Sequence, residues 1–228
     1  MTFDKQIFWQ KKIIAWENAR YHGEVKEQGL IEKIVRGGGS SIRERLAMFV
    51  EILKPHVRDK KILDLGCGSG FLFKELAQSG AREFIGIDLA ESAVERAKQL
   101  AAEHGYQDRS QFIHGDVARM EYPPFDIAVS LGLLDWLTDE ELHMVFKKIR
   151  NKQFVMAIAK KQNSVEQWLH RGYVTVAYGY RSQGYVPRYY AVSDMLALLK
   201  GHGFHDVKVI CDRRISFGAI LHNLPSTS

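Results

Sequence analysis

The chain has 228 residues, of which 46% are hydrophobic and 26% are charged, the balance of a globular protein with a sizeable core. No stretch approaches the roughly 20 uninterrupted apolar residues that a membrane span needs, and the charged start MTFDKQIFWQKK lacks the apolar centre of a secretory signal. Cys67 and Cys211 are the only cysteines and show no metal-ligand spacing. We therefore expect a cytoplasmic protein with no disulfide framework and no metal site.

The net charge of +5 is unevenly distributed along the chain. Residues 1–61 contain 13 basic and 8 acidic residues, residues 62–150 contain 9 and 15, and residues 151–228 contain 10 and 4. The corresponding net charges are +5, −6 and +6. An acidic middle between two basic flanks suggests two regions with different ligands.

The N-terminal part of the chain has a helical pattern. Apolar residues at helical spacing predict short helices within 1–36, and three glycines at 37–39 then interrupt the chain. Ser41 and Glu44 have the spacing of a capping box, which predicts a further helix that ends near Leu53.

From residue 61 onward, short apolar strands alternate with helices. Strands are expected at 61–65, 83–88, 111–114, 125–130, 154–159, 206–211 and 215–222, and helices at 70–78, 90–103, 138–149 and 192–200. Such an alternation forms right-handed crossovers in a parallel sheet. Only about four residues, DRRI, separate the last two strands, a connection that is too short for a parallel crossover.

The expected fold is therefore α/β, with a doubly wound, mostly parallel seven-stranded sheet whose last strand is antiparallel. Residues 1–57 are expected to form an N-terminal helical lid and substrate region, and residues 58–228 the main domain. Residues 161–190 are rich in tyrosine and show no clear period. A segment of this length between sheet elements is usually a functional loop, so we interpret it as a substrate cap inserted after the fifth strand.

The strongest motif is ILDLGCGSG at residues 62–70, a strand that runs into a glycine-rich turn at the start of a helix. Glycines let the chain turn sharply and let a ligand lie against the main chain. A dinucleotide fingerprint GxGxxG would place its third glycine at position 71, which is Phe71 here. The pattern is instead GxGxG preceded by Asp64; a tight turn that binds no ligand is the alternative.

Two further acids follow the next two strands. Asp88 lies 22 residues after Gly66, near the interval of about 20 residues at which an acid meets ribose hydroxyls in nucleotide-binding folds, and Asp116 follows the third strand. Taken alone, each acid could equally start a helix or occupy a surface turn. Because ligands of open α/β sheets bind at the carboxyl ends of the strands, we expect Asp64, Asp88 and Asp116 to line one crevice.

At Asp64, Gly66, Gly68 and Gly70 the chain resembles the class I S-adenosylmethionine-dependent methyltransferases, whose first motif is (D/E)xGxGxG. The resemblance covers about 58–222 and implies S-adenosylmethionine as the cofactor, with its ribose at Asp88 and its adenine amine at Asp116. Residues 34–53 are also similar to the helical entrance of the magnesium-protoporphyrin O-methyltransferases. The residues expected to bind the cofactor are Asp64, Gly66, Cys67, Gly68, Gly70, Asp88, Leu89, Asp116, Val117 and Leu131.

Acceptor contacts are expected from the two basic and aromatic segments outside the core fold. The candidates are Trp9, Tyr21, His22, Arg36, Tyr185, Arg188 and Tyr189. Arginine with tyrosine suits a small, ring-containing or anionic acceptor, and simple packing of the aromatic rings is the alternative. His22 and Asp135 are candidates for a catalytic base, although Asp135 can also initiate a helix. We expect methyl transfer to oxygen or nitrogen without a metal.

Two other functions remain open. The first is a methyltransferase acting on RNA, DNA or protein. A nucleic-acid acceptor would explain the basic flanks, but the chain has no appended nucleic-acid recognition module. The YPPF sequence at 122–125 is not an amino-methylation motif, because it precedes the fourth strand and begins with tyrosine. A non-catalytic partner subunit that binds the cofactor is the second alternative. The sequence does not specify the oligomeric state.

Overall fold

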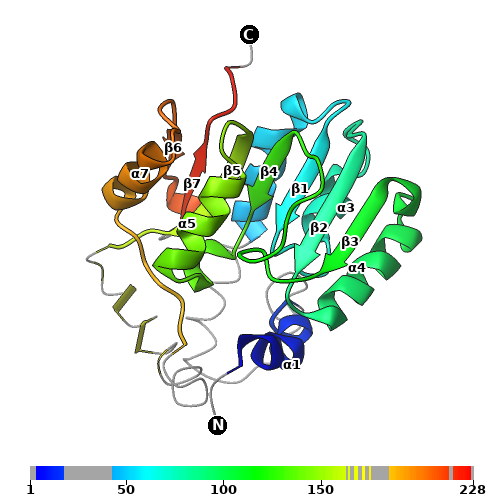
Figure 1. Ribbon diagram of the computed structural model, residues 1–228, viewed down its shortest axis with the longest axis horizontal. Coiled ribbons are helices and arrows are strands. Elements are labelled where there is room, and N and C mark those ends of the chain that lie inside the picture. The colour runs from blue at the N-terminus through cyan, green and yellow to red at the C-terminus, as the bar shows by residue number, and fades with distance from the viewer. Residues whose placement is uncertain are drawn as a thin grey trace.

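The structure is a computed structural model, which describes residues 4–17, 43–162, 164, 167, 168, 171, 172, 175, 185–215 and 218–226. Its body is a sheet with helices on both faces (Figure 1). Three of the predicted acceptor contacts, Tyr21, His22 and Arg36, lie outside the described residues, as does most of 161–190.

The sheet has seven strands in the order β3-β2-β1-β4-β5-β7-β6. Strands β1 to β5 pair in parallel, and β7 is antiparallel to both β5 and β6. The order reverses between β1 and β4, the place where open α/β sheets bind ligands. This confirms the predicted doubly wound sheet with its antiparallel last strand. The strands are β1 (Lys61–Leu65), β2 (Glu83–Asp88), β3 (Ser110–His114), β4 (Ile127–Ser130), β5 (Gln153–Ala159), β6 (Lys208–Ile210) and β7 (Gly218–His222).

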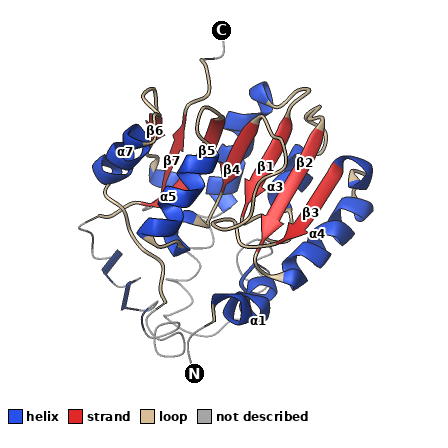
Figure 2. Ribbon diagram, in the orientation of Figure 1, coloured by secondary structure: helices blue, strands red, loops and turns tan. Residues whose placement is uncertain are grey.

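Helices cover both faces of the sheet (Figure 2). The helix over 43–53, α3 (Phe71–Leu76) and α4 (Glu91–Glu103) pack on one face, and α5 (Asp139–Lys148) and α7 (Val192–Gly201) pack on the other. Successive residues of β1 join opposite layers, Ile62 the first and Leu63 the second, and both are completely buried. Burial of both faces explains why the central strands are continuous apolar runs.

Helix α1 (Lys5–Glu17) lies at the end of the sheet rather than on a face (Figure 1). Ile13 packs on Ala90 and Ala93 at the start of α4. The side-chain oxygen of Gln10 accepts a hydrogen bond from the main-chain N–H of Ser92 at 3.3 Å. These contacts hold α1 beside the carboxyl ends of the strands.

Short-range polar contacts decide where two of the elements begin. Thr138 and Glu141 form a capping box at the start of α5. The last strand was expected from residue 215, and that boundary is wrong, since β7 begins at Gly218 and Arg213–Ile215 form a 3-10 turn. Asp212 starts this turn, because its carboxylate accepts from the main-chain N–H of Arg214 at 2.8 Å.

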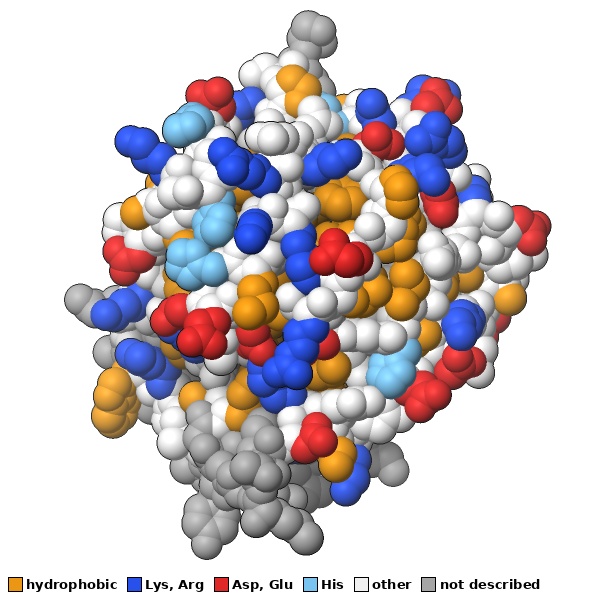
Figure 3. Space-filling view, viewed as in Figure 1, with side chains coloured by type: hydrophobic (Ala, Val, Ile, Leu, Met, Phe, Trp, Pro, Cys, Tyr) orange, Lys and Arg blue, Asp and Glu red, His pale blue; other side chains and the backbone are white. Residues whose placement is uncertain are grey.

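The segment between β3 and β4, residues 115–126, contains neither helix nor strand and crosses the face shown in Figure 1 as a loop. The same face, drawn as spheres in Figure 3, carries hydrophobic side chains over the middle of the sheet with lysine and arginine side chains around them. No helix within the described ranges is long and apolar enough to cross a membrane.

Candidate functional site

A cavity that is partly open to solvent lies at the carboxyl ends of β1 to β4. Its walls include every residue expected to bind the cofactor except Gly70: Asp64, Gly66, Cys67, Gly68, Asp88, Leu89, Asp116, Val117 and Leu131. Gly70 instead faces α4, where a Cβ atom on it would lie 3.3 Å from the Cβ of Ala97. The topology of the sheet thus brings the three strand-end acids to one place.

The glycine-rich turn after β1 is tied to the end of β2. The N–H groups of Gly66 and Cys67 both donate to the carbonyl of Ile87, at 2.8 and 3.1 Å, and the N–H of Gly68 donates to Asp88 Oδ2 at 2.9 Å. Gly66 and Gly68 have φ angles of +75° and +51°, which residues other than glycine adopt only with strain. The turn therefore presents main chain to the cavity in a fixed shape.

Asp88 makes two main-chain contacts. In addition to Gly68, it accepts from the N–H of Ala90 at 2.9 Å through Oδ1. The carboxylate thus supports the start of α4, the role that the sequence leaves open, while it also lines the cavity. Burial raises the pKa of Asp88, and the hydrogen bonds from Ala90 and Gly68 oppose that rise.

Asp64 is the acid whose hydrogen bonding is incomplete. It is 3% exposed, and its Oδ1 atom has no hydrogen-bond partner among the described residues. Burial, and then the nearby charge of Asp88, raises the pKa of Asp64 to about 8. A buried carboxylate in this state is stabilised by any cationic group that enters the cavity.

Glu17 is a fourth acid in the cavity, and the sequence reasoning missed it. It is the last residue of α1, and its Oε1 atom accepts from the N–H of Ser69 at 2.9 Å, while Oε2 accepts from the Ser69 hydroxyl. Burial raises its pKa to about 7. A signal was present in the sequence, because Glu17 follows Trp9 and Ile13 at intervals of four residues and so shares the helix face that lines the cavity.

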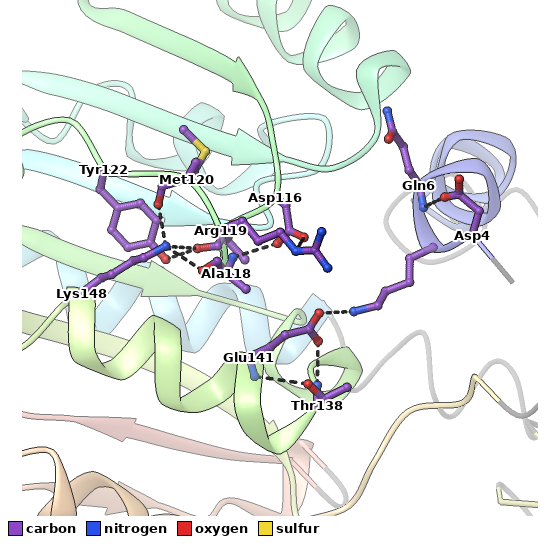
Figure 4. A network of polar contacts seen from close by, with 12 residues as sticks. Asp4, Gln6, Asp116, Ala118, Arg119, Met120, Tyr122, Thr138, Glu141 and Lys148 are labelled. Carbon is purple, nitrogen blue, oxygen red and sulfur yellow. Dashed lines mark hydrogen bonds and ion pairs between the residues drawn. The ribbon is translucent and has the colours of Figure 1, made fainter. Parts of the chain in front are cut away.

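Helix α1 crosses the cavity and is held at both ends. Glu17 contacts the glycine-rich turn at one end. At the other end Lys5 forms an ion pair with Glu141 of α5, whose second oxygen accepts from the N–H of Thr138 at 2.8 Å (Figure 4). The helix therefore covers the space between the glycine-rich turn and α5.

Three aromatic side chains line another part of the wall. The ring centroids of Trp9 and Trp136 are 4.8 Å apart, and those of Trp136 and Tyr185 are 5.2 Å apart. The indole N–H of Trp9 donates to the Tyr185 hydroxyl at 3.2 Å. Two of the predicted acceptor contacts, Trp9 and Tyr185, therefore meet on one wall, although they are 176 positions apart in the chain. Trp136 joins them without having been predicted.

The other described acceptor candidates do not line the cavity. Arg188 forms an ion pair with Asp139 at 2.7 Å. The ring of Tyr189 lies 5.2 Å from the guanidinium carbon of Arg171. Arg188 therefore contacts the first residue of α5, and Tyr189 contacts a helical residue of the 161–190 segment.

Asp135, a candidate base, is also absent from the lining of the cavity. It is 6% exposed, and its Oδ1 atom accepts from the N–H of Ala159, the last residue of β5, at 2.7 Å. It lies in a 3-10 turn, Leu134–Trp136, whereas Thr138 caps α5. Burial raises its pKa to about 6. In this position the carboxylate anchors the turn that carries Trp136 to the sheet.

The raised pKa values predict that the ligand-free protein loses stability as pH rises. Folded Glu17 and Asp64 keep their protons up to about pH 7 and pH 8, whereas unfolded carboxyl groups release theirs near pH 4. Since the folded state binds more protons between these values, the free energy of unfolding falls as pH rises from about 4.5 to 8. Urea unfolding at pH 5.5 and pH 8 measures this slope, and Glu17→Gln should make it shallower. An identical slope in both proteins would contradict the role given to Glu17.

Comparison with known sequences agrees with this geometry. Residues 62–152 match the family model described as a methyltransferase domain. The protein arginine N-methyltransferase 1 of Saccharomyces cerevisiae is 28% identical over 131 residues, which cover 57% of this chain and 37% of the relative. The ubiquinone biosynthesis O-methyltransferase of Idiomarina loihiensis is 35% identical over 92 residues, which cover 40% and 37%. The chain thus matches little more than a third of the length of these curated relatives.

A solved structure resembles almost the whole chain. The magnesium protoporphyrin IX methyltransferase ChlM from Synechocystis PCC 6803, crystallised with bound SAH, has a TM-score of 0.71 at 18% identity and aligns over 96% of this chain and 98% of its own. At that identity the likeness concerns the fold. Residues 62–152 are therefore similar to a methyltransferase domain, and the chain shares the seven-stranded fold of this solved methyltransferase.

Proposed function

We propose that the protein transfers a methyl group from S-adenosylmethionine to a small, ring-containing or anionic acceptor. The observation that carries the proposal is Asp64, whose buried Oδ1 atom lacks a partner among the described residues, in a cavity bounded by a glycine-rich turn. S-adenosylmethionine has two positive groups, an ammonium and a sulfonium. Either one can supply the countercharge that the buried acid lacks.

The residues of the cavity fit the rest of the cofactor as well. Gly66 and Gly68 allow its amino-acid part to approach the main chain, with Glu17 and Asp64 near the ammonium. Asp88 is assigned to the ribose hydroxyls, for which a carboxylate is a suitable acceptor. When bound, S-adenosylmethionine supplies a methyl group on a positively charged sulfur, which an acceptor must approach in line with the carbon–sulfur bond. Helix α1 would keep water out of that path.

The aromatic wall supports a flat acceptor. Trp9, Trp136 and Tyr185 give broad apolar surfaces, and the Lys5 ammonium lies 6.0 Å from the centre of the Tyr185 ring. An acceptor with a ring and a carboxylate could contact both. Among the described residues, no group of three or more His, Cys, Asp and Glu side chains is arranged to hold a metal ion. We propose a transfer that needs none.

The predicted division of the chain becomes part of the proposal. Residues 1–57 act as the lid and residues 58–228 as the methyltransferase domain, with 161–190 as the acceptor cap. The position of α1 over the cavity and of Tyr185 in its wall supports this division. We also propose a cytoplasmic location, because Cys67 and Cys211 are both free thiols, as a reducing compartment favours.

A methyl-transfer assay tests the acceptor class. Purified protein and S-adenosylmethionine with a tritiated methyl group are added to a cell extract, which is then separated by molecular size. We expect label in the small-molecule fraction only when the purified protein is added. Label in the protein or RNA fraction would instead favour the macromolecular alternatives. Cofactor binding without any transfer would favour the non-catalytic partner subunit.

A further inference from the structure

The ammonium of Lys148, in the last turn of α5, contacts three main-chain carbonyls of the loop between β3 and β4 (Figure 4). Its Nζ atom donates to Met120 O at 2.6 Å, to Ala118 O at 2.7 Å and to Val117 O at 3.4 Å. A lysine has three donor hydrogens, so this loop engages all of them. The end of a helix also favours a cation, because the last carbonyls carry partial negative charge.

These carbonyls belong to a loop that has no regular hydrogen-bonding ladder, since residues 115–126 are neither helix nor strand. The Tyr122 hydroxyl adds a hydrogen bond to Val117 O at 2.7 Å, and Lys148 Nζ lies 5.2 Å from the centre of the Tyr122 ring. Lys148 and Tyr122 thus donate hydrogen bonds to loop carbonyls that no helix or strand ladder satisfies. Burial lowers the pKa of Lys148, and the acids Glu121 and Asp116 oppose that change.

The same loop residues also hold Asp116. The N–H of Ala118 donates to Asp116 Oδ1 at 2.9 Å, and the N–H of Met120 donates to the Asp116 carbonyl at 3.0 Å. Ala118 and Met120 therefore contact Asp116 through their N–H groups and Lys148 through their carbonyls. Asp116 and Val117 line the cavity, whereas Lys148 does not.

We propose that Lys148 is a positioning residue that sets the cavity's selectivity for a purine with an exocyclic amine. It acts through the loop that it holds: Lys148 and Tyr122 both donate to Val117 O, the carbonyl of the peptide group whose N–H, at Ala118, donates to the Asp116 carboxylate. The inference rests on the proposed function, in which Asp116 accepts from the adenine amine. It adds a residue outside the cavity that decides how sharply the amine is recognised.

The test compares S-adenosylhomocysteine with S-inosylhomocysteine, in which a carbonyl replaces the amine and the neighbouring N1 carries a hydrogen, by calorimetric titration. The wild type should prefer S-adenosylhomocysteine by about tenfold or more, as expected for one hydrogen bond to a charged acceptor. Lys148→Met keeps an unbranched side chain that is one atom shorter and removes its donors, and it should reduce the preference to about threefold or less. Lys147→Met, at the exposed neighbouring position, should behave as the wild type.

The two kinds of failure are distinguishable. If the wild type binds neither ligand, the proposed function fails. If the wild type discriminates and Lys148→Met binds both ligands more weakly with its preference intact, Lys148 is only structural and the inference is overturned. Should Lys148→Met not fold, Lys148→Gln, which keeps two donor hydrogens without the charge, is judged by the same ratio.

Discussion

Replacement of Asp88 by alanine is expected to weaken S-adenosylhomocysteine binding at least about a hundredfold. The change removes the acceptor for the N–H groups of Gly68 and Ala90. It also removes the group that we assign to the ribose hydroxyls. A hydrogen bond to a charged acceptor contributes about 1.5–3 kcal/mol. The loss of two or more hydrogen bonds to Asp88 therefore accounts for the expected fall in affinity. Calorimetric titration measures the dissociation constant.

Asp126→Ala is the matched control for that variant. The Asp126 carboxylate also accepts from a main-chain N–H, that of Lys61 at 2.8 Å, but it lies at the start of β1, the opposite end of the strand from the cavity. We expect it to lower the thermal midpoint while the dissociation constant stays within about twofold of the wild type. Equal affinities in Asp88→Ala and Asp126→Ala would mean that Asp88 does not contribute to binding.

Gly68→Ala is expected to give the second large effect, on both α1 and ligand binding. A Cβ atom on Gly68 would lie 2.0 Å from Glu17 Oε1, so the Glu17 carboxylate must leave Ser69. The φ angle of +51° adds strain of about 1–2 kcal/mol for an alanine. We expect S-adenosylhomocysteine affinity to fall by about thirtyfold or more, together with faster proteolysis within residues 1–42.

Gly105→Ala separates backbone strain from the loss of the Glu17 contact. Gly105 has a φ of +69°, and apart from its chain neighbours no atom of the described residues lies within 4 Å of a Cβ built on it. The two variants should therefore lose similar stability to strain, but Gly105→Ala should keep the wild-type affinity and the wild-type proteolysis pattern. If Gly68→Ala matches Gly105→Ala in both measurements, the contact between Glu17 and the glycine-rich turn has no functional role.

Most of the fold could be predicted because its strands are buried on both faces and therefore appear as continuous apolar runs. Ile62 and Leu63 face opposite layers, and both need apolar side chains. The start of β7 could not be placed by this rule. A side-chain contact of Asp212 bends the chain into a 3-10 turn, and that contact overrides the apolar pattern around Ile215.

The acids at the strand ends of the cavity could be predicted from the sequence, whereas the side chains that cover the cavity could be predicted only in part. Asp64, Asp88 and Asp116 follow three parallel strands, so the topology alone brings them together. Trp136 reaches the cavity through packing between segments far apart in the chain, which local pattern does not report, whereas Glu17 shares a helix face with the predicted Trp9. Asp135 shows the converse, since it follows the fourth strand and was a candidate base, while its carboxylate accepts a hydrogen bond from the end of β5.

We propose that this cavity binds S-adenosylmethionine rather than a dinucleotide. The most direct test is a calorimetric titration of the wild-type protein at pH 8 with S-adenosylmethionine and, separately, with NAD⁺. We predict one-to-one binding of S-adenosylmethionine and no heat with NAD⁺, because the turn is GxGxG and buried acids line the cavity. Binding of NAD⁺ with no binding of S-adenosylmethionine would contradict the assignment of S-adenosylmethionine to this cavity.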